Sequence, residues 1–186
     1  MKLAFHQLPN YTLLDHQNWE GKWELISGIP YAMAPAPNLE HQELSQVIFQ
    51  KFNEMLKNCK ECKSYMAINW QIDEYSVVIP DNLIVCNAPK KGTYLTVTPV
   101  IIAEVVSPSS WAYDCNLKKE LFEKNGVKYY LIFHPIKRTC DLYELDLVKN
   151  KYELKVRWSE ADKKVMFEFH IGKGCKKKIN LAKFFI

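Results

Sequence analysis

The stretches VVIPDNLIV (Val77–Val85) and PVIIAEVVS (Pro99–Ser107) are both apolar, strand-like runs that contain one acidic residue. Asp81 interrupts the first run and Glu104 interrupts the second. An unpaired buried charge is costly, so such a group is usually neutralised, paired or bound to a metal. The two carboxylates therefore require an explanation that a hydrophobic core alone does not provide.

The pattern of apolar residues around these runs predicts an α/β fold, with a central mixed sheet flanked by helices. In chain order, the pattern predicts a hairpin at 23–33, a helix at 39–58, strands at 65–72, 76–86 and 100–106, a helix at 113–125, a strand at 127–133, a hairpin at 141–145 and 152–158, and a strand at 164–170. Asn38 is expected to cap the first helix and Gly126 to end the second. The last strands predict a β-rich C-terminal extension.

Length and composition indicate one soluble domain over residues 1–186. Hydrophobic residues make up 48% of the chain, which is enough for a core. No apolar run reaches the roughly 18 residues that crossing a membrane requires, and no signal peptide is evident. We therefore expect a cytoplasmic protein that makes no membrane contact.

The chain contains six cysteines, which a reducing cytoplasm would keep as thiols. Cys59 and Cys62 form a C-x-x-C, but no second pair follows at the spacing of a zinc site. This motif also lies at the C-terminal end of the predicted helix, whereas a redox C-x-x-C would lie at the N-terminal start of a helix. Structural cysteines are the favoured interpretation, and a redox or zinc protein stays as a third alternative.

The net charge of +4 is too small to indicate nucleic-acid binding by itself. Lys90 and Lys91, however, lie between the two acidic runs. They are candidates for contact with a phosphate backbone, with solvated surface lysines as the alternative.

If the two acidic runs pair side by side, Asp81 and Glu104 can point to one place. Two carboxylates and a backbone carbonyl would form a site of hard oxygen ligands, which Mg²⁺ and Mn²⁺ prefer. The alternative is that each acid is an exposed residue at the end of a strand.

Six motifs follow one another between residues 23 and 145. They are W-E-L-I-S-G, A-P-x-x-E-H-Q at 36–42, I-P-D, A-E-V-V-S-P-S, D-x-x-x-K and G-V-x-Y-Y-L-I at 126–132. This order resembles the PD-(D/E)xK nuclease superfamily and, more narrowly, the Uma-type family of restriction-endonuclease-like proteins. The resemblance implies a restriction-endonuclease-like core and a metal-dependent endonuclease.

The resemblance also implies roles for single residues. Asp81 and Glu104 match the two metal-binding acids, with the backbone carbonyl of Val105 as a further ligand. The lysine that usually stands two positions after the glutamate is absent, because Val106 occupies that position. Lys118 matches the helix lysine to which this family assigns the same role, which is to orient or deprotonate the attacking water or to offset charge.

Three further residues match the family less firmly. Glu24 matches a glutamate of the opening hairpin and is expected to assist with a metal or water contact, unless it faces outward. His41 is a candidate accessory residue, with a cap or surface role as the alternative. Asp114 is better interpreted as the N-cap or dipole partner of the second helix than as a ligand.

The sequence thus predicts an endonuclease that uses Mg²⁺ or Mn²⁺ to hydrolyse phosphodiester bonds, with DNA as substrate and a homodimer as the expected assembly. The alternative is a non-catalytic module of the same fold that binds nucleic acid or another copy of itself.

Overall fold

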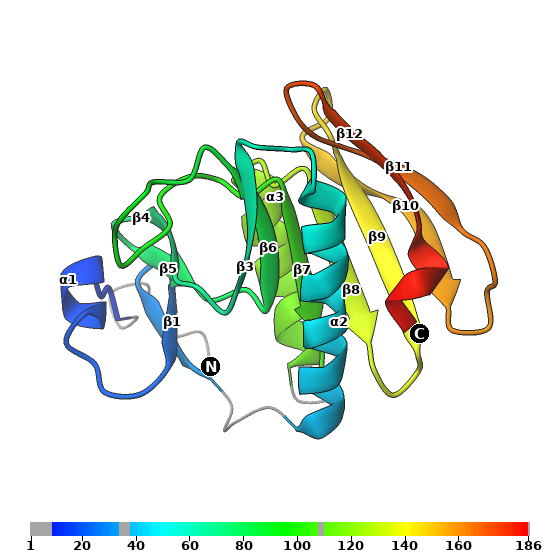
Figure 1. Cartoon of the computed structure of the whole chain (residues 1–186). Coiled ribbons are helices and arrows are strands. Elements are labelled where there is room, and N and C mark those ends of the chain that lie inside the picture. The colour runs from blue at the N-terminus through cyan, green and yellow to red at the C-terminus, as the bar shows by residue number, and fades with distance from the viewer. Residues whose placement is uncertain (1–8, 34–37, 108–109, 186) are drawn as a thin grey trace.

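The computed structural model describes residues 9–33, 38–107 and 110–185 (Figure 1). In chain order its elements are α1 (Leu13–His16), β1 (Trp23–Ile26), β2 (Ile29–Ala32), α2 (Leu39–Leu56), β3 (Cys62–Met66), β4 (Trp70–Asp73), β5 (Ser76–Val78), β6 (Asn82–Cys86), β7 (Ile101–Val105), the π-helix η2 (Tyr113–Lys118), α3 (Lys119–Lys124), β8 (Tyr129–His134), β9 (Thr139–Asp146), β10 (Lys151–Ser159), β11 (Met166–Gly172), β12 (Cys175–Asn180) and the 3-10 helix η3 (Leu181–Phe185). Two parts of the sequence motifs lie outside the described residues. They are Ala36 and Pro37 of A-P-x-x-E-H-Q, and residues 108–109 of A-E-V-V-S-P-S.

A six-stranded sheet in the order β10-β9-β8-β7-β6-β3 forms the centre of the molecule. β7 and β8 run parallel, and the other neighbouring strands are antiparallel. β7 is buried along its whole length and β8 over all but its last residue, which explains their almost continuous apolar sequences. The predicted α/β fold with a mixed central sheet is confirmed.

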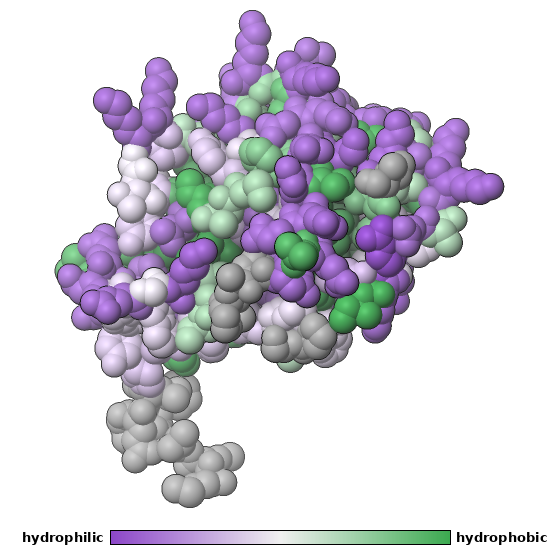
Figure 2. Space-filling model, turned by 60° about the horizontal axis from the view of Figure 1, so that its bottom comes forward, coloured by the Kyte–Doolittle hydropathy of each residue, from purple (hydrophilic) through white to green (hydrophobic). Residues whose placement is uncertain are grey.

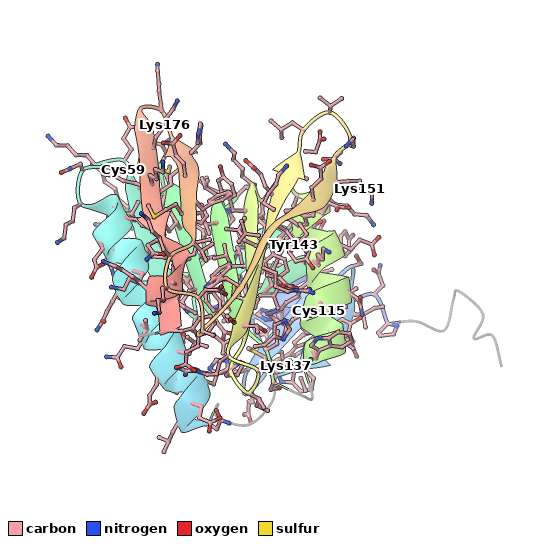
Figure 3. The ribbon with its side chains drawn as sticks, turned by 90° about the vertical axis from the view of Figure 1, so that its right-hand side faces the viewer. Cys59, Cys115, Lys137, Tyr143, Lys151 and Lys176 are labelled. Carbon is pink, nitrogen blue, oxygen red and sulfur yellow. A yellow bond between two sulfur atoms is a disulfide. The ribbon has the colours of Figure 1, made fainter. Side chains whose placement is uncertain are left out.

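Different elements cover the two faces of this sheet. α2, the β11–β12 hairpin and η3 pack on one face, while η2, α3 and a second sheet in the order β2-β1-β5-β4 cover the other. Figure 3 shows α2 and α3 on opposite sides of the central strands. Side chains alternate along a strand, so Ala103 and Val105 face α2. Glu104 therefore points to the face of η2 and α3.

The helix α2 follows its sequence pattern closely. The side chain of Asn38 caps it by accepting a hydrogen bond from the His41 backbone N–H at 2.9 Å. Its buried apolar residues are spaced along one stripe, namely Leu44, Ile48, Phe52 and Met55. The helix ends at Leu56, two residues before the predicted end. The predicted hairpin at 23–33 also forms, with positive φ angles at Ser27 and Gly28 in its two-residue turn.

The predicted strand at 76–86 is two strands in the structure. β5 pairs with β1 and β4 in the four-stranded sheet, whereas β6 pairs with β3 and β7 in the central sheet. The chain changes sheets at Pro80, which has no N–H to donate to a ladder. Asp81 consequently lies where the two sheets meet.

The C-terminal part is rich in strands, as predicted. β9 and β10 form the expected hairpin, and the strand predicted at 164–170 is β11. β11 pairs with β12, which was not predicted because its sequence CKKKIN is dominated by lysines. None of the helices in the described residues has both the length and the apolar composition needed to cross a bilayer.

The cysteine prediction is wrong for four of the six residues. Cys59 is disulfide-bonded to Cys175, and Cys62 to Cys86. The C-x-x-C therefore forms no internal redox pair, and no cluster of metal-binding side chains is found among the described residues. Cys115 and Cys140 are free thiols. Disulfides persist mainly in oxidising compartments, so they lend no support to the cytoplasmic assignment, which stays a prediction.

The Cys59–Cys175 disulfide joins the end of α2 to the β11–β12 hairpin across 116 residues of sequence. We expect Cys175→Ser to lower the free energy of unfolding by about 2–4 kcal/mol, because the unfolded chain loses a long-range constraint. Urea denaturation would measure the change. Cys115→Ser, which removes a free thiol, should have little effect. If a reductant leaves the stability of the wild type unchanged, the disulfide does not stabilise the fold.

Candidate active site

Asp81 and Glu104 converge at the junction of β6 and β7. The two strands are antiparallel neighbours, as the side-by-side pairing predicted, with Asn82 opposite Ala103. The backbone N–H of Asp81 donates to Glu104 Oε2 at 3.1 Å, and the Val105 N–H donates to Asp81 Oδ2 at 2.8 Å. The side chain of Glu104 is 3% exposed and that of Asp81 is 23% exposed. Asp81 is thus the acid that solvent or a ligand can reach.

Lys118 of η2 lies among buried carboxylates. Its Nζ is 2.9 Å from Glu104 Oε1, 2.9 Å from Glu24 Oε1 and 3.7 Å from Asp114 Oδ1, and its side chain is only 4% exposed. Burial would lower the pKa of Lys118, but the neighbouring carboxylates hold it well above its ordinary value. Lys118 is therefore a hydrogen-bond donor and a fixed positive charge, and it has no free lone pair with which to deprotonate a water.

Glu24 is buried, so the alternative of an outward-facing hairpin residue is wrong. Besides its contact with Lys118, Glu24 Oε1 accepts a hydrogen bond from the Ile79 N–H at 2.6 Å. Its Oε2 accepts one from the hydroxyl of Tyr113 at 2.7 Å. Because both oxygens are occupied by these donors, Glu24 joins β1 to the end of β5 and to η2.

His41 contacts the candidate site from the first turn of α2. Its Nε2 lies 3.1 Å from Asp81 Oδ2. Burial would lower the pKa of His41, but the hydrogen bond and charge of Asp81 raise it above its ordinary value. In turn, burial would raise the pKa of Asp81, and the hydrogen bond and charge of His41 lower it. His41 therefore contacts one of the two candidate metal-binding acids, and its accessory role stays a prediction.

Of the two roles expected for Asp114, the N-cap is wrong, whereas its place in the first turn of η2 agrees with a partner of the helix dipole. Ala112 occupies the cap position of η2, and Asp114 lies inside the helix with its side chain 8% exposed. Burial raises its pKa, while Lys118 opposes the rise. The D-x-x-x-K spacing could have identified this contact, because residues four apart lie on the same side of a helix. Nothing in the sequence singled out Tyr113.

The cluster contains more carboxylates than cations. Glu24, Glu104 and Asp114 surround Lys118, and Asp81 pairs with His41 at the edge of the cluster. Burial raises the pKa of Glu104 well above its ordinary value; Lys118 opposes the rise, and the other carboxylates add to it. An excess of negative charge in a buried place favours the uptake of a cation.

The donor atoms fit a hard dication. Asp81 and Glu104 offer carboxylate oxygens, which are the ligands that Mg²⁺ and Mn²⁺ prefer. Among the described residues, however, no three His, Cys, Asp or Glu side chains form a complete metal site. A site here would thus depend on two carboxylates with backbone or solvent oxygens, as magnesium sites commonly do. The Val105 N–H holds Asp81 in place; no contact identifies the Val105 carbonyl as a ligand.

Lys90 and Lys91 are not part of this cluster. Both are exposed in the loop that leaves β6 at Cys86, the end of the strand opposite Asp81. Figure 2 shows the molecule with the end that carries the N-terminus of α2 turned toward the viewer. Hydrophilic residues cover much of this face, and hydrophobic residues form separate patches. A contact between these two lysines and a backbone stays a prediction.

We expect Lys118→Ala to lower the free energy of unfolding by about 3–5 kcal/mol in the presence of EDTA, because it leaves buried carboxylates without their cation. Lys124→Ala, which removes an exposed lysine of α3 paired with Glu120, should change it by less than about 1 kcal/mol. Urea denaturation of both variants measures the difference. Equal stabilities of the two variants would show that the buried ion pairs do not hold the site together.

Comparison with known proteins identifies the family and a similar fold. The model of the Uma2 family, described as "Putative restriction endonuclease", matches residues 4–166, beyond the predicted core of 23–145. A crystal structure described as that of a putative nuclease belonging to DUF820, from Anabaena variabilis, has a TM-score of 0.69 at 16% identity, over 83% of this chain and 88% of that chain. At this identity the likeness concerns the fold alone. A search of curated proteins found no match. The resemblance seen in the sequence is confirmed, and the chain belongs to the Uma2 family.

Proposed function

We propose that this protein is an endonuclease that requires Mg²⁺ or Mn²⁺ and hydrolyses phosphodiester bonds in DNA. The convergence of Asp81, Glu104 and Lys118, which come from three separate segments, is the observation that carries the proposal. The description of the family and that of the similar Anabaena variabilis protein support a nuclease-like activity. DNA as substrate and the metal requirement are parts of our proposal.

Asp81 and Glu104 are the residues that would hold the metal. When bound, a divalent cation would polarise the scissile phosphate and make a bound water more acidic. The chain orients Asp81 through the Val105 N–H and His41, both of which contact Oδ2. Neither donor contacts Oδ1, which is the carboxylate oxygen that would contact the metal.

Lys118 would stabilise the negative charge that develops on the phosphate. A protonated amine held in a site with little water interacts strongly with such charge and needs little reorganisation. It can also orient an attacking water by donating a hydrogen bond. Glu24 contacts both ends of η2, Tyr113 at its start and Lys118 at its end, so we assign Glu24 a positioning role in place of direct metal contact.

The exposed Lys90 and Lys91 would contact the DNA backbone outside the site, where each neutralised phosphate makes binding more sensitive to salt. A homodimer would bring two such sites to the two strands of a duplex. The contact of the two lysines with DNA and the homodimer are both parts of the proposal.

Cleavage of plasmid DNA in Mg²⁺ tests the active site. We expect Asp81→Asn and Glu104→Gln each to lower the cleavage rate by about 100-fold or more, because each removes an oxygen charge that holds the cation. Glu61→Gln, at an exposed acid next to the far end of β6, should cleave like the wild type. Equal rates for the wild type and both site variants would exclude this cluster as the catalytic centre.

Calorimetric titration with Mn²⁺ tests the metal independently of cleavage. The wild type and Glu61→Gln should bind the ion, and Asp81→Asn should bind it at least about tenfold more weakly because one hard ligand is lost. A protein that binds no Mn²⁺ would instead fit the non-catalytic module of the same fold.

A further inference from the structure

A recess of about 300 Å³ lies beside the candidate active site. Its walls come from the segment after β7, the residues before η2, the end of β8 and the turn that joins β8 to β9. They include Val106, Trp111, His134, Ile136 and Lys137. This volume is at the lower end of the range that small ligands occupy. The recess therefore has room for one compact ring system.

The backbone places the recess next to the acid cluster. Val106 directly follows Val105, whose N–H holds Asp81. The Val106 N–H donates to the carbonyl of Phe133 at 2.9 Å. His134, the next residue, therefore lies at the same edge of the sheet as Val106. The recess and the acids consequently share the carboxyl ends of the parallel strands β7 and β8.

The side chains of the recess are suited to a flat, partly polar ring. The side chain of Trp111 is 49% exposed and that of Ile136 is 71% exposed, which is a large exposure for apolar groups beside a polar site. Indole is a good surface for stacking of a nucleobase. Burial lowers the pKa of His134, so its neutral ring has one hydrogen-bond donor and one acceptor for a base edge. Lys137 adds a positive charge suited to a phosphate.

We propose that this recess binds one unpaired nucleobase next to the phosphodiester that the site cleaves. This inference rests on the proposed nuclease function and specifies its substrate. In a continuous duplex each base is stacked and paired, so it enters such a recess only after extrusion, which costs free energy. The protein therefore prefers single-stranded or locally unpaired strands over a continuous duplex.

Binding in EDTA tests the inference without cleavage. Fluorescence anisotropy would compare three labelled DNA probes of equal length: a single strand, the same strand with stable abasic residues in place of its nucleotides, and a duplex. The wild type should bind the single strand about tenfold more tightly than the abasic strand, the size of effect that stacking of one base produces. It should also bind the single strand more tightly than the duplex.

The variant Trp111→Ala should bind the single strand and the abasic strand with equal affinity. Tyr75→Ala is the matched control, because Tyr75 is an aromatic residue with 39% exposure on the β4–β5 turn, outside the recess. It should keep the tenfold difference. Ile136→Ala provides a second variant, and circular dichroism verifies the fold of each.

The outcomes separate this inference from the nuclease proposal. Equal affinity of the wild type for the single strand and the abasic strand, or tighter binding of the duplex, overturns the recess as a base-binding site even if plasmid DNA is cleaved. Base-dependent binding that Trp111→Ala abolishes supports the recess as a base-binding site. If the wild type shows this binding and cleaves no DNA, the nuclease proposal fails and the base-binding site stands.

Discussion

The ion pairs of Lys118 with Glu104 and Glu24 are the constraint on which the candidate site depends. They connect η2 to β7 and β1, which are distant in the sequence. A buried ammonium is tolerated only when carboxylates surround it, and buried carboxylates need a cation in return. The burial of each charged side chain thus requires the burial of its partners, and the segments that carry them must pack in one arrangement.

The fold creates this arrangement by changing sheets at Pro80. β5 ends in the four-stranded sheet and β6 begins in the central one (Figure 1). Asp81 lies between these two strands, and its N–H donates to Glu104 of β7. The N-terminus of α2 adds His41. At the other end of β6, one disulfide joins β3 to β6, and a second joins the segment after α2 to β12. The Cys62–Cys86 disulfide and Asp81 lie at opposite ends of β6, so the cross-link does not cover Asp81, the most exposed of the acids.

The proposed binding of a cation and a phosphate depends on the distribution of charge over the whole cluster more than on any single residue. Three carboxyl groups, of Glu24, Glu104 and Asp114, share Lys118. Asp81 pairs with His41 and is more exposed than these three. In our proposal an incoming cation or phosphate meets Asp81 first, while the buried ion pairs keep the lysine and the other acids in place. The adjoining recess adds an apolar surface to this polar edge. We propose that the two together hold a nucleotide by its phosphate and its base.

Much of this could be predicted from the sequence, because the relevant signals are local. The stripe on α2, the cap at Asn38 and the apolar runs around Asp81 and Glu104 indicated the elements and their pairing. The ordered motifs indicated the family. The sequence also drew attention to Glu24 and Lys118, although not to their mutual contact.

The tertiary structure alone decided which charges are buried together. The sequence indicated a cap at Asp114, but the folded chain buries this residue inside η2, and the direction of β6 carries Lys90 and Lys91 away from the acids. The sequence also missed the disulfides and β12, since the pairing of cysteines and of a lysine-rich strand depends on partners far along the chain. Local patterns set secondary structure through steric and hydrophobic preferences, whereas desolvation and ion pairing depend on neighbours that only the folded chain brings together.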